Sequence, residues 1–269
     1  MPFQDSRPIG VFDSGIGGLT VLKELALQFP NENFLYLGDT ARLPYGSKSP
    51  STIRKYSEQN IRFLDKQEVK AIVIACNSAS TQVPEDEFDG LPVYNVITPG
   101  AQRALELSST GRIGVLGTRA TINSQAYTHK IREFSPKAQV FDQPCPLFVP
   151  LAEEGWDGDP VTNLIVFRYL NPLLQNHIDT LILGCTHYPI LKNSISRVTG
   201  SGIELVDSGE AIAQWILRDF EEGRLRRRTD TLMPRKIEVL TTDASAHFSE
   251  MALKILKPVK ADHFRVVDI

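Results

Sequence analysis

Two short apolar runs in this chain each end in a cysteine that small polar or ionisable residues follow. They read AIVIACNS at 71–78, where the cysteine is Cys76, and TLILGCTH at 180–187, where it is Cys185. Runs of this length and composition predict strands that are buried on both faces, as in parallel sheets. In α/β proteins the carboxyl ends of such strands form the ligand site. The chain is therefore predicted to be an α/β protein with a thiol at each of two strand ends.

The strand pattern also repeats along the chain. The opening run IGVFD at 9–13 returns as IGVLG at 113–117, and the two cysteine runs follow in the same order at a similar displacement. This repeat predicts two pseudo-symmetric lobes, each with a mostly parallel sheet flanked by helices. Facing lobes place one thiol on each side of a shared cleft, which we expect to be the active site.

The rest of the chain alternates between short apolar runs and helical patterns. The predicted strands are Ile9–Phe12, Phe34–Leu37, Ala71–Ala75, Val93–Val96, Arg112–Leu116, Leu181–Leu183, Ile203–Val206 and Ile237–Leu240. The predicted helices lie near Leu19–Leu27, Ile53–Leu64, Ala101–Leu107, Val161–Leu174, Ile190–Val198 and Ala211–Glu221. This alternation is typical of sheets that helices cover on both faces.

Two segments follow a strand and precede a helix where the chain is expected to cross between lobes. They are Ile97–Gly100 and Asp207–Gly209. We therefore expect residues 1–97 and 208–269 to form the first lobe, which carries Cys76. Residues 98–207 are expected to form the second lobe, which carries Cys185.

Composition excludes several classes of partner. At 269 residues the chain is long enough for two cores. Its net charge of −3 offers no electrostatic footprint for nucleic acid or an anionic membrane. No apolar run approaches the roughly 20 residues that span a bilayer, and no signal peptide is visible. With three cysteines, which cannot all pair within one chain, we expect a cytoplasmic protein with reduced thiols.

Two loops after strands are candidates for ligand contact. The loop Asp13–Gly18 opens a helix, and its glycines permit close backbone approach, but it has neither a dinucleotide fingerprint nor a Walker lysine. Asp13 is placed to orient an ammonium group or to polarise a thiol. The loop Gly38–Gly46 contains a Pro-Tyr-Gly turn that can form a rigid wall with a backbone N–H at Gly46. Each loop is also compatible with a turn that has only a structural role and contacts no ligand.

The cysteines also have structural interpretations, because free cysteine is often a small buried hydrophobe. We assign Cys145 to that role, since no matched context surrounds it. A zinc site made of Cys76, Cys185 and His187 is disfavoured because neither CxxC nor HxxxH spacing occurs, so no metal is expected. Two opposed thiols instead suit the inversion of a stereocentre, which needs a base on one face of a carbon and an acid on the other.

Several segments resemble the signature segments of glutamate racemases. They are Asp13–Gly18, Gly38–Arg42 with Pro44–Gly46, Ala75–Ser78 and Gly184–Pro189, with further similarity at Gly114–Thr121, Val149–Glu153 and Thr241–Asp243. The similarity covers nearly the whole chain, and the combination is specific although no single segment is. One departure is Ser78, where the family usually has threonine, so a hydroxyl is kept and a methyl contact is lost.

The resemblance implies a cofactor-independent interconversion of L- and D-glutamate, which supplies D-glutamate for bacterial peptidoglycan. It implies that Cys76 is the base acting on the D-enantiomer and Cys185 the base acting on the L-enantiomer, assisted by Asp13 and His187 respectively. The implied substrate-binding positions are Ser14, Tyr45, Gly46, Asn77, Ser78 and Thr186, and we add Asp13, His187 and Glu153 as further candidates. We also expect a homodimer.

Other functions remain open from the residues alone. Within the same superfamily, aspartate or hydantoin racemases differ in pocket size, which sequence reveals poorly. Two lobes can also clamp an amino acid without chemistry, and Cys76 and Cys185 can form a redox disulfide, although CxxC is absent. A pyridoxal phosphate mechanism lacks a recognisable lysine context.

Overall fold

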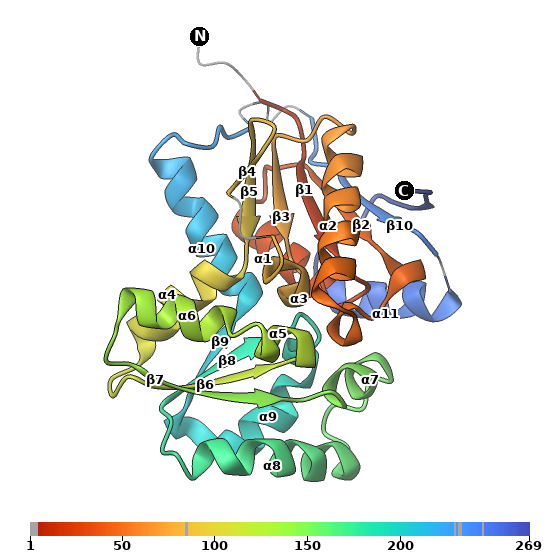
Figure 1. Ribbon diagram of the computed structural model, residues 1–269. Coiled ribbons are helices and arrows are strands. Elements are labelled where there is room, and N and C mark those ends of the chain that lie inside the picture. The colour runs from red at the N-terminus through yellow and green to blue at the C-terminus, as the bar shows by residue number, and fades with distance from the viewer. Residues whose placement is uncertain (1–4, 84–85, 229, 231–232, 244) are drawn as a thin grey trace.

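The computed structural model describes residues 5–83, 86–228, 230, 233–243 and 245–269. Within this part of the chain two sheets lie one above the other, each flanked by helices (Figure 1). The larger sheet has the order β11-β10-β2-β1-β3-β5-β4, and the smaller has the order β7-β6-β8-β9. Except for the β4–β5 pair, neighbouring strands are parallel. The predicted α/β class with two lobes is confirmed.

The larger sheet contains β1 (Ile9–Asp13), β2 (Phe34–Gly38), β3 (Ala71–Ile74), β4 (Glu87–Phe88), β5 (Leu91–Asn95), β10 (Ile237–Thr241) and β11 (His263–Val266). The smaller sheet contains β6 (Arg112–Gly117), β7 (Gln139–Pro144), β8 (Thr180–Gly184) and β9 (Glu204–Asp207). The chain thus builds most of the first sheet, then the second, and returns to the first.

The α-helices are α1 (Leu19–Gln28), α2 (Pro50–Asp65), α3 (Asn77–Ser80), α4 (Ile97–Leu107), α5 (Arg119–Asn123), α6 (Ala126–Phe134), α7 (Phe148–Glu153), α8 (Pro160–Leu174), α9 (Lys192–Thr199), α10 (Ser208–Glu221) and α11 (Ala246–Leu256). Short 3₁₀ turns are η1 (Thr40–Arg42), η2 (Tyr45–Ser47), η3 (Tyr188–Leu191) and η4 (Gly200–Gly202). Among the described residues, no helix has both the length and the apolar run that crossing a bilayer requires.

The repeated sequence corresponds to a repeated strand arrangement. The strands β1 and β6, which carry the IGV repeat, each lie in parallel between two others: β1 between β2 and β3, and β6 between β7 and β8. Of these neighbours, β3 and β8 are the strands that lead into Cys76 and Cys185. Equivalent local sequences therefore place the two cysteines at equivalent strand ends.

Burial on both faces explains the apolar composition of the strands. In β1, Ile9 and Val11 pack in a core with residues of α1, α10 and α11, whereas Phe12 packs in another core with residues of α2. Each fully buried aliphatic or aromatic side chain of this kind contributes about 1.5–3 kcal/mol. Side chains that alternate along one strand thus pack against helices on both faces of the sheet, as the uninterrupted apolar runs predict.

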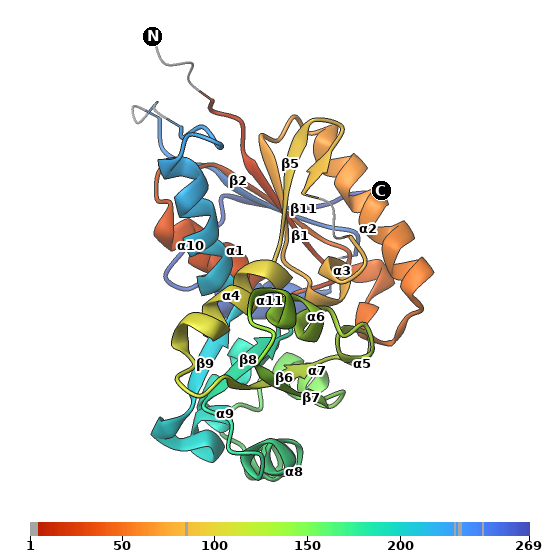
Figure 2. The same ribbon diagram turned by 60° about the vertical axis from the view of Figure 1, so that its left-hand side comes forward.

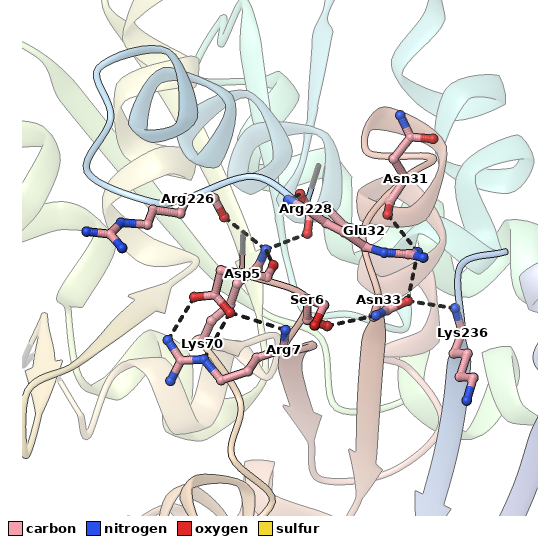
Figure 3. A network of polar contacts seen from close by, with 10 residues as sticks. All are labelled: Asp5, Ser6, Arg7, Asn31, Glu32, Asn33, Lys70, Arg226, Arg228 and Lys236. Atoms are coloured by element: carbon pink, nitrogen blue, oxygen red, sulfur yellow. Dashed lines mark hydrogen bonds and ion pairs between the residues drawn. The ribbon is translucent and has the colours of Figure 1, made fainter. Parts of the chain in front are cut away.

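A buried ionic cluster, shown in Figure 3, lies at the amino end of β3, whereas Cys76 follows the carboxyl end of this strand. Lys70 directly precedes β3, and its fully buried Nζ lies 2.6 Å from Glu32 Oε2. The same ammonium donates to the carbonyl oxygens of Asp5 at 3.3 Å and Arg226 at 2.9 Å. The second carboxylate oxygen of Glu32 accepts the Arg228 backbone N–H at 2.8 Å. One ion pair thereby joins four separate segments of the first lobe.

Candidate active site

A cavity of about 240 Å³ lies where the carboxyl ends of β3 and β8 meet. Both Cys76 and Cys185 line it. The other lining residues are Ser14, Pro44, Tyr45, Gly46, Ser47, Asn77, Ser78, Thr118, Arg119, Pro146, Val149, Pro150, Thr186 and His187. The structure therefore brings the two thiols and most of the sequence-predicted residues to one site between the lobes.

Cys76 is the last residue before α3 and is 5% exposed. Burial, and then the negative charge of Asp13, raise the pKa of the Cys76 thiol well above its ordinary value. Hydrogen bonds with the Ala79 backbone and with Ser14 act in the opposite direction, the latter with Sγ 3.7 Å from Oγ. Cys76 is consequently a neutral thiol near pH 7 and holds a proton that it can donate.

Cys185 has a different neighbour, the imidazole of His187. His187 Nδ1 lies 3.9 Å from Cys185 Sγ, and its Nε2 lies 3.1 Å from Glu153 Oε1. Burial lowers the pKa of His187, but hydrogen bonds with Cys185 and Glu153 outweigh it and raise the pKa to about 10. The imidazole is therefore protonated at neutral pH, and its positive charge stabilises negative charge on the adjacent sulfur.

This protonation predicts how stability depends on pH. Because the folded pKa of about 10 lies above the ordinary value of 6.5, the stabilisation is complete below about pH 6.5 and is lost as the pH rises towards 10. We expect the free energy of urea unfolding to decrease over this interval. The decrease should be smaller in His187→Gln. Equal pH slopes for the two proteins would contradict the assignment.

Asp13 ends β1 and lies beside the cavity rather than among the residues that line it. Its Oδ2 accepts the Gly15 N–H at 2.9 Å, and its Oδ1 accepts the Thr186 hydroxyl at 3.2 Å. The carboxylate is fully buried. Asp13 thus holds the glycine loop of the first lobe against the cysteine loop of the second.

The Pro-Tyr-Gly turn forms another wall of the cavity. Tyr45 is 1% exposed, donates its hydroxyl to Asp39 and accepts from Asn60 Nδ2 at 3.1 Å. These bonds anchor the Tyr45 side chain in the first lobe, so the backbone of the turn is held at the cavity. A Cβ on Gly46 would lie 2.6 Å from Thr118 Cβ in the second lobe, so only glycine permits this approach.

Several residues at the site were not predicted individually. Thr118 directly follows β6, as Ser14 directly follows β1, so the sequence repeat could have identified Thr118 as a site residue. Its Oγ1 lies 2.8 Å from Ser78 Oγ, which joins the lobes at the cavity wall. Arg119 and Pro146 also line the cavity, and no strand-end rule singles them out.

The described residues also bear on the other cysteine chemistries considered above. Within them, no cluster of three histidine, cysteine or acidic side chains is arranged to hold a metal ion. Cys76, Cys145 and Cys185 are all free thiols. Cys145 is fully buried in the core of the second lobe.

Fold and site together define a class of protein in which two α/β lobes each present one thiol to a shared cavity. The family model for Asp/Glu/hydantoin racemases matches residues 15–216. The chain belongs to this family.

Individual relatives agree with that membership. A glutamate racemase of Syntrophus aciditrophicus is 51% identical over 252 residues, which is 93% of each chain. The crystal structure of a glutamate racemase isoform of Bacillus anthracis matches with a TM-score of 0.91 at 33% identity, over 98% of each chain. The glutamate racemase of Francisella tularensis in complex with D-glutamate matches with a TM-score of 0.89 at 38% identity, over 98% of each chain. The resemblance found from the sequence motifs is confirmed.

Proposed function

We propose that this protein is a glutamate racemase that interconverts L- and D-glutamate by proton transfer between two cysteines, without a cofactor, and supplies D-glutamate for peptidoglycan synthesis. The observation that carries the proposal is that Cys76 and Cys185, from different lobes, line the same small cavity. Its volume of about 240 Å³ suits a small substrate.

The proposed reaction uses the two thiols in opposite protonation states. With L-glutamate, the Cys185 thiolate removes the α-proton, and the electron pair moves into the neighbouring carboxylate. Cys76 then donates its proton to the opposite face of the α-carbon, which leaves D-glutamate, a Cys76 thiolate and a Cys185 thiol. The reverse reaction exchanges these roles. The protonated His187 beside Cys185 and the raised pKa of Cys76 both favour the state that reacts with L-glutamate.

We further propose that the polar groups around the thiols hold the substrate. Hydroxyls of Ser14 and Ser78 and the backbone at Tyr45 and Gly46 supply donors for carboxylates, and Thr186 lines the cavity with these four residues. Asn77 lines it too. Asp13 and His187 assist Cys76 and Cys185 respectively, and Glu153 orients His187 through their hydrogen bond.

Racemisation in heavy water, followed by chiral separation, tests the proposal. Transfer between two bases predicts that solvent deuterium first enters the newly formed enantiomer. The base that removes the α-proton can return it only to the same face, whereas the opposite face receives its hydrogen from the second thiol, which has exchanged with solvent. Equal early labelling of recovered substrate would indicate a single base. Aspartate and hydantoins are assayed in parallel, and a clear preference for either would overturn glutamate as the substrate.

We propose that the protein forms a homodimer through α8. Val161, Leu164 and Phe167 lie on one face of this helix and are 50%, 71% and 55% exposed. Exposed apolar side chains grouped on one element are typical of an interaction surface. We expect Leu164→Glu to shift sedimentation from dimer to monomer, while Leu27→Glu, which alters an exposed leucine of α1, leaves the dimer intact. A monomeric native protein would contradict the proposal.

The lobe boundaries and the location are proposals as well. We propose that residues 1–97 with 208–269, and residues 98–207, are the two lobes, because the strands β6 to β9 all belong to the smaller sheet. We propose a cytoplasmic location, because three free thiols persist most readily in a reducing compartment.

A further inference from the structure

The amide of Asn77 connects the two lobes immediately beside Cys76. Its Nδ2 donates to the hydroxyl oxygen of Tyr127 at 2.9 Å and to Ser208 Oγ at 3.1 Å. Tyr127 belongs to α6 of the second lobe, and Ser208 begins α10, where the chain returns to the first lobe. All three residues are 2% exposed. The contact is therefore a buried polar bridge between elements that are far apart in sequence.

The hydroxyl of Ser208 fixes which way this amide faces. Ser208 Oγ donates to the carbonyl oxygen of Leu183 at 3.3 Å, two residues before Cys185. Since a hydroxyl has only one proton, the bond to Leu183 leaves Ser208 Oγ as an acceptor towards Asn77. An acceptor there requires the NH₂ side of the amide. The amide carbonyl must then face away from the bridge.

That carbonyl oxygen has no partner of its own. Asn77 Oδ1 is buried and makes no hydrogen bond with any of the described residues, although Asn77 lines the cavity. A buried acceptor without a partner costs about 1–3 kcal/mol, so such atoms in native proteins call for an explanation. A ligand that brings a donor into the cavity would satisfy it.

We propose that Tyr127 and Ser208 are positioning residues: by binding both protons of the Asn77 amide, they turn its carbonyl oxygen towards the cleft to receive the substrate's donor group. This rests on the proposed function, under which the donor is the ammonium of glutamate, because its carboxylates only accept. The bridge runs from the residue after Cys76 to the strand that precedes Cys185. One amide group thus takes part both in substrate recognition and in one of the contacts between the lobes.

Tyr127→Phe tests the proposal, because it removes the acceptor and keeps the ring. Without this bond the amide is less well oriented, so we expect KM for glutamate to rise about fivefold to tenfold with kcat nearly unchanged. Ser208→Ala should act in the same direction, and Ser208→Thr, which restores a hydroxyl, should recover native KM. The matched control is Tyr94→Phe, which deletes a buried tyrosine hydroxyl bonded to Asp219 at 2.7 Å outside the cavity. It should leave KM unchanged.

A double-mutant cycle between Asn77→Ala and Tyr127→Phe, read from urea unfolding without substrate, measures the bridge independently of turnover. Changes in the free energy of unfolding that are not additive support the bridge, whereas the changes for Asn77→Ala and Tyr94→Phe should be additive. Additive changes in the first cycle, or a KM for Tyr127→Phe equal to that of Tyr94→Phe, would overturn the proposal. If the native protein fails to racemise glutamate, the proposed function falls, and the cycle still decides whether the bridge exists.

Discussion

Replacing Cys76 by serine is expected to reduce racemisation by about 10²–10⁴-fold, because the hydroxyl is a far weaker acid than the thiol and does not ionise to an anionic base near neutral pH. The loss must be the same in both directions. Enantiomers have equal free energies, so the ratio of kcat/KM values for L- and D-glutamate stays at one in any variant. The measurement is chiral analysis of glutamate after incubation with the purified variant, started from each enantiomer.

The half-reactions identify which thiol serves which face. In Cys76→Ser the remaining Cys185 should still exchange the α-proton of L-glutamate with heavy water without inversion, and in Cys185→Ser the corresponding exchange should occur with D-glutamate. Cys145→Ser is the matched control, because Cys145 is buried outside the cavity and its thiol donates to the Gln143 carbonyl oxygen at 3.6 Å, a bond that serine can keep. Full activity in Cys76→Ser, or exchange of the opposite enantiomer, would refute the assignment.

Replacing Lys70 by methionine is expected to lower the free energy of unfolding by about 3–5 kcal/mol, because it leaves the Glu32 carboxylate buried without its cation. The ion pair lies with both side chains almost fully buried, at 0% and 4% exposure. Figure 3 shows how the ammonium is surrounded by oxygen atoms from three other segments. Urea unfolding followed by circular dichroism measures the loss.

Two further variants show whether the lost stability comes from the unpaired Glu32 carboxylate or from replacing a lysine as such. Lys254→Met breaks an ion pair whose partners are 61% and 66% exposed, and should change stability by less than about 0.5 kcal/mol. Lys70→Met combined with Glu32→Gln removes the uncompensated charge and should recover part of the stability. A Lys70→Met protein as stable as Lys254→Met would disprove the role of the cluster.

The positions of the two thiols could be predicted because they depend on local rules. An apolar run that ends in cysteine places the sulfur at a strand end, and the repeat of IGV relates the two ends. The strands β7 and β11 could not be found this way. Both lie at sheet edges and are largely unburied, so their sequences lack an apolar run. The helix α11 was also missed, although it covers the first sheet.

The bridge through Asn77 was beyond sequence reasoning for a different reason. Tyr127 and Ser208 belong to separate helices, and their meeting depends on how the lobes pack. Asn77 itself was predicted as a substrate residue through the family resemblance, but nothing local reveals which of its amide atoms faces the cavity. Similarly, the closeness of Thr118 to Gly46 is a property of two facing loops and is not encoded in either loop alone.

The chain connects the two sheets twice, from β5 to β6 through α4 and from β9 to β10 through α10, and these two helices lie side by side (Figures 1 and 2). A single connection would allow one lobe to swivel freely against the other. With two adjacent connections, the motion that remains is chiefly a rotation of one lobe against the other about the line that joins the connections. Any rotation of one lobe against the other about this line would change the distance between the two sulfurs, because one sulfur belongs to each lobe.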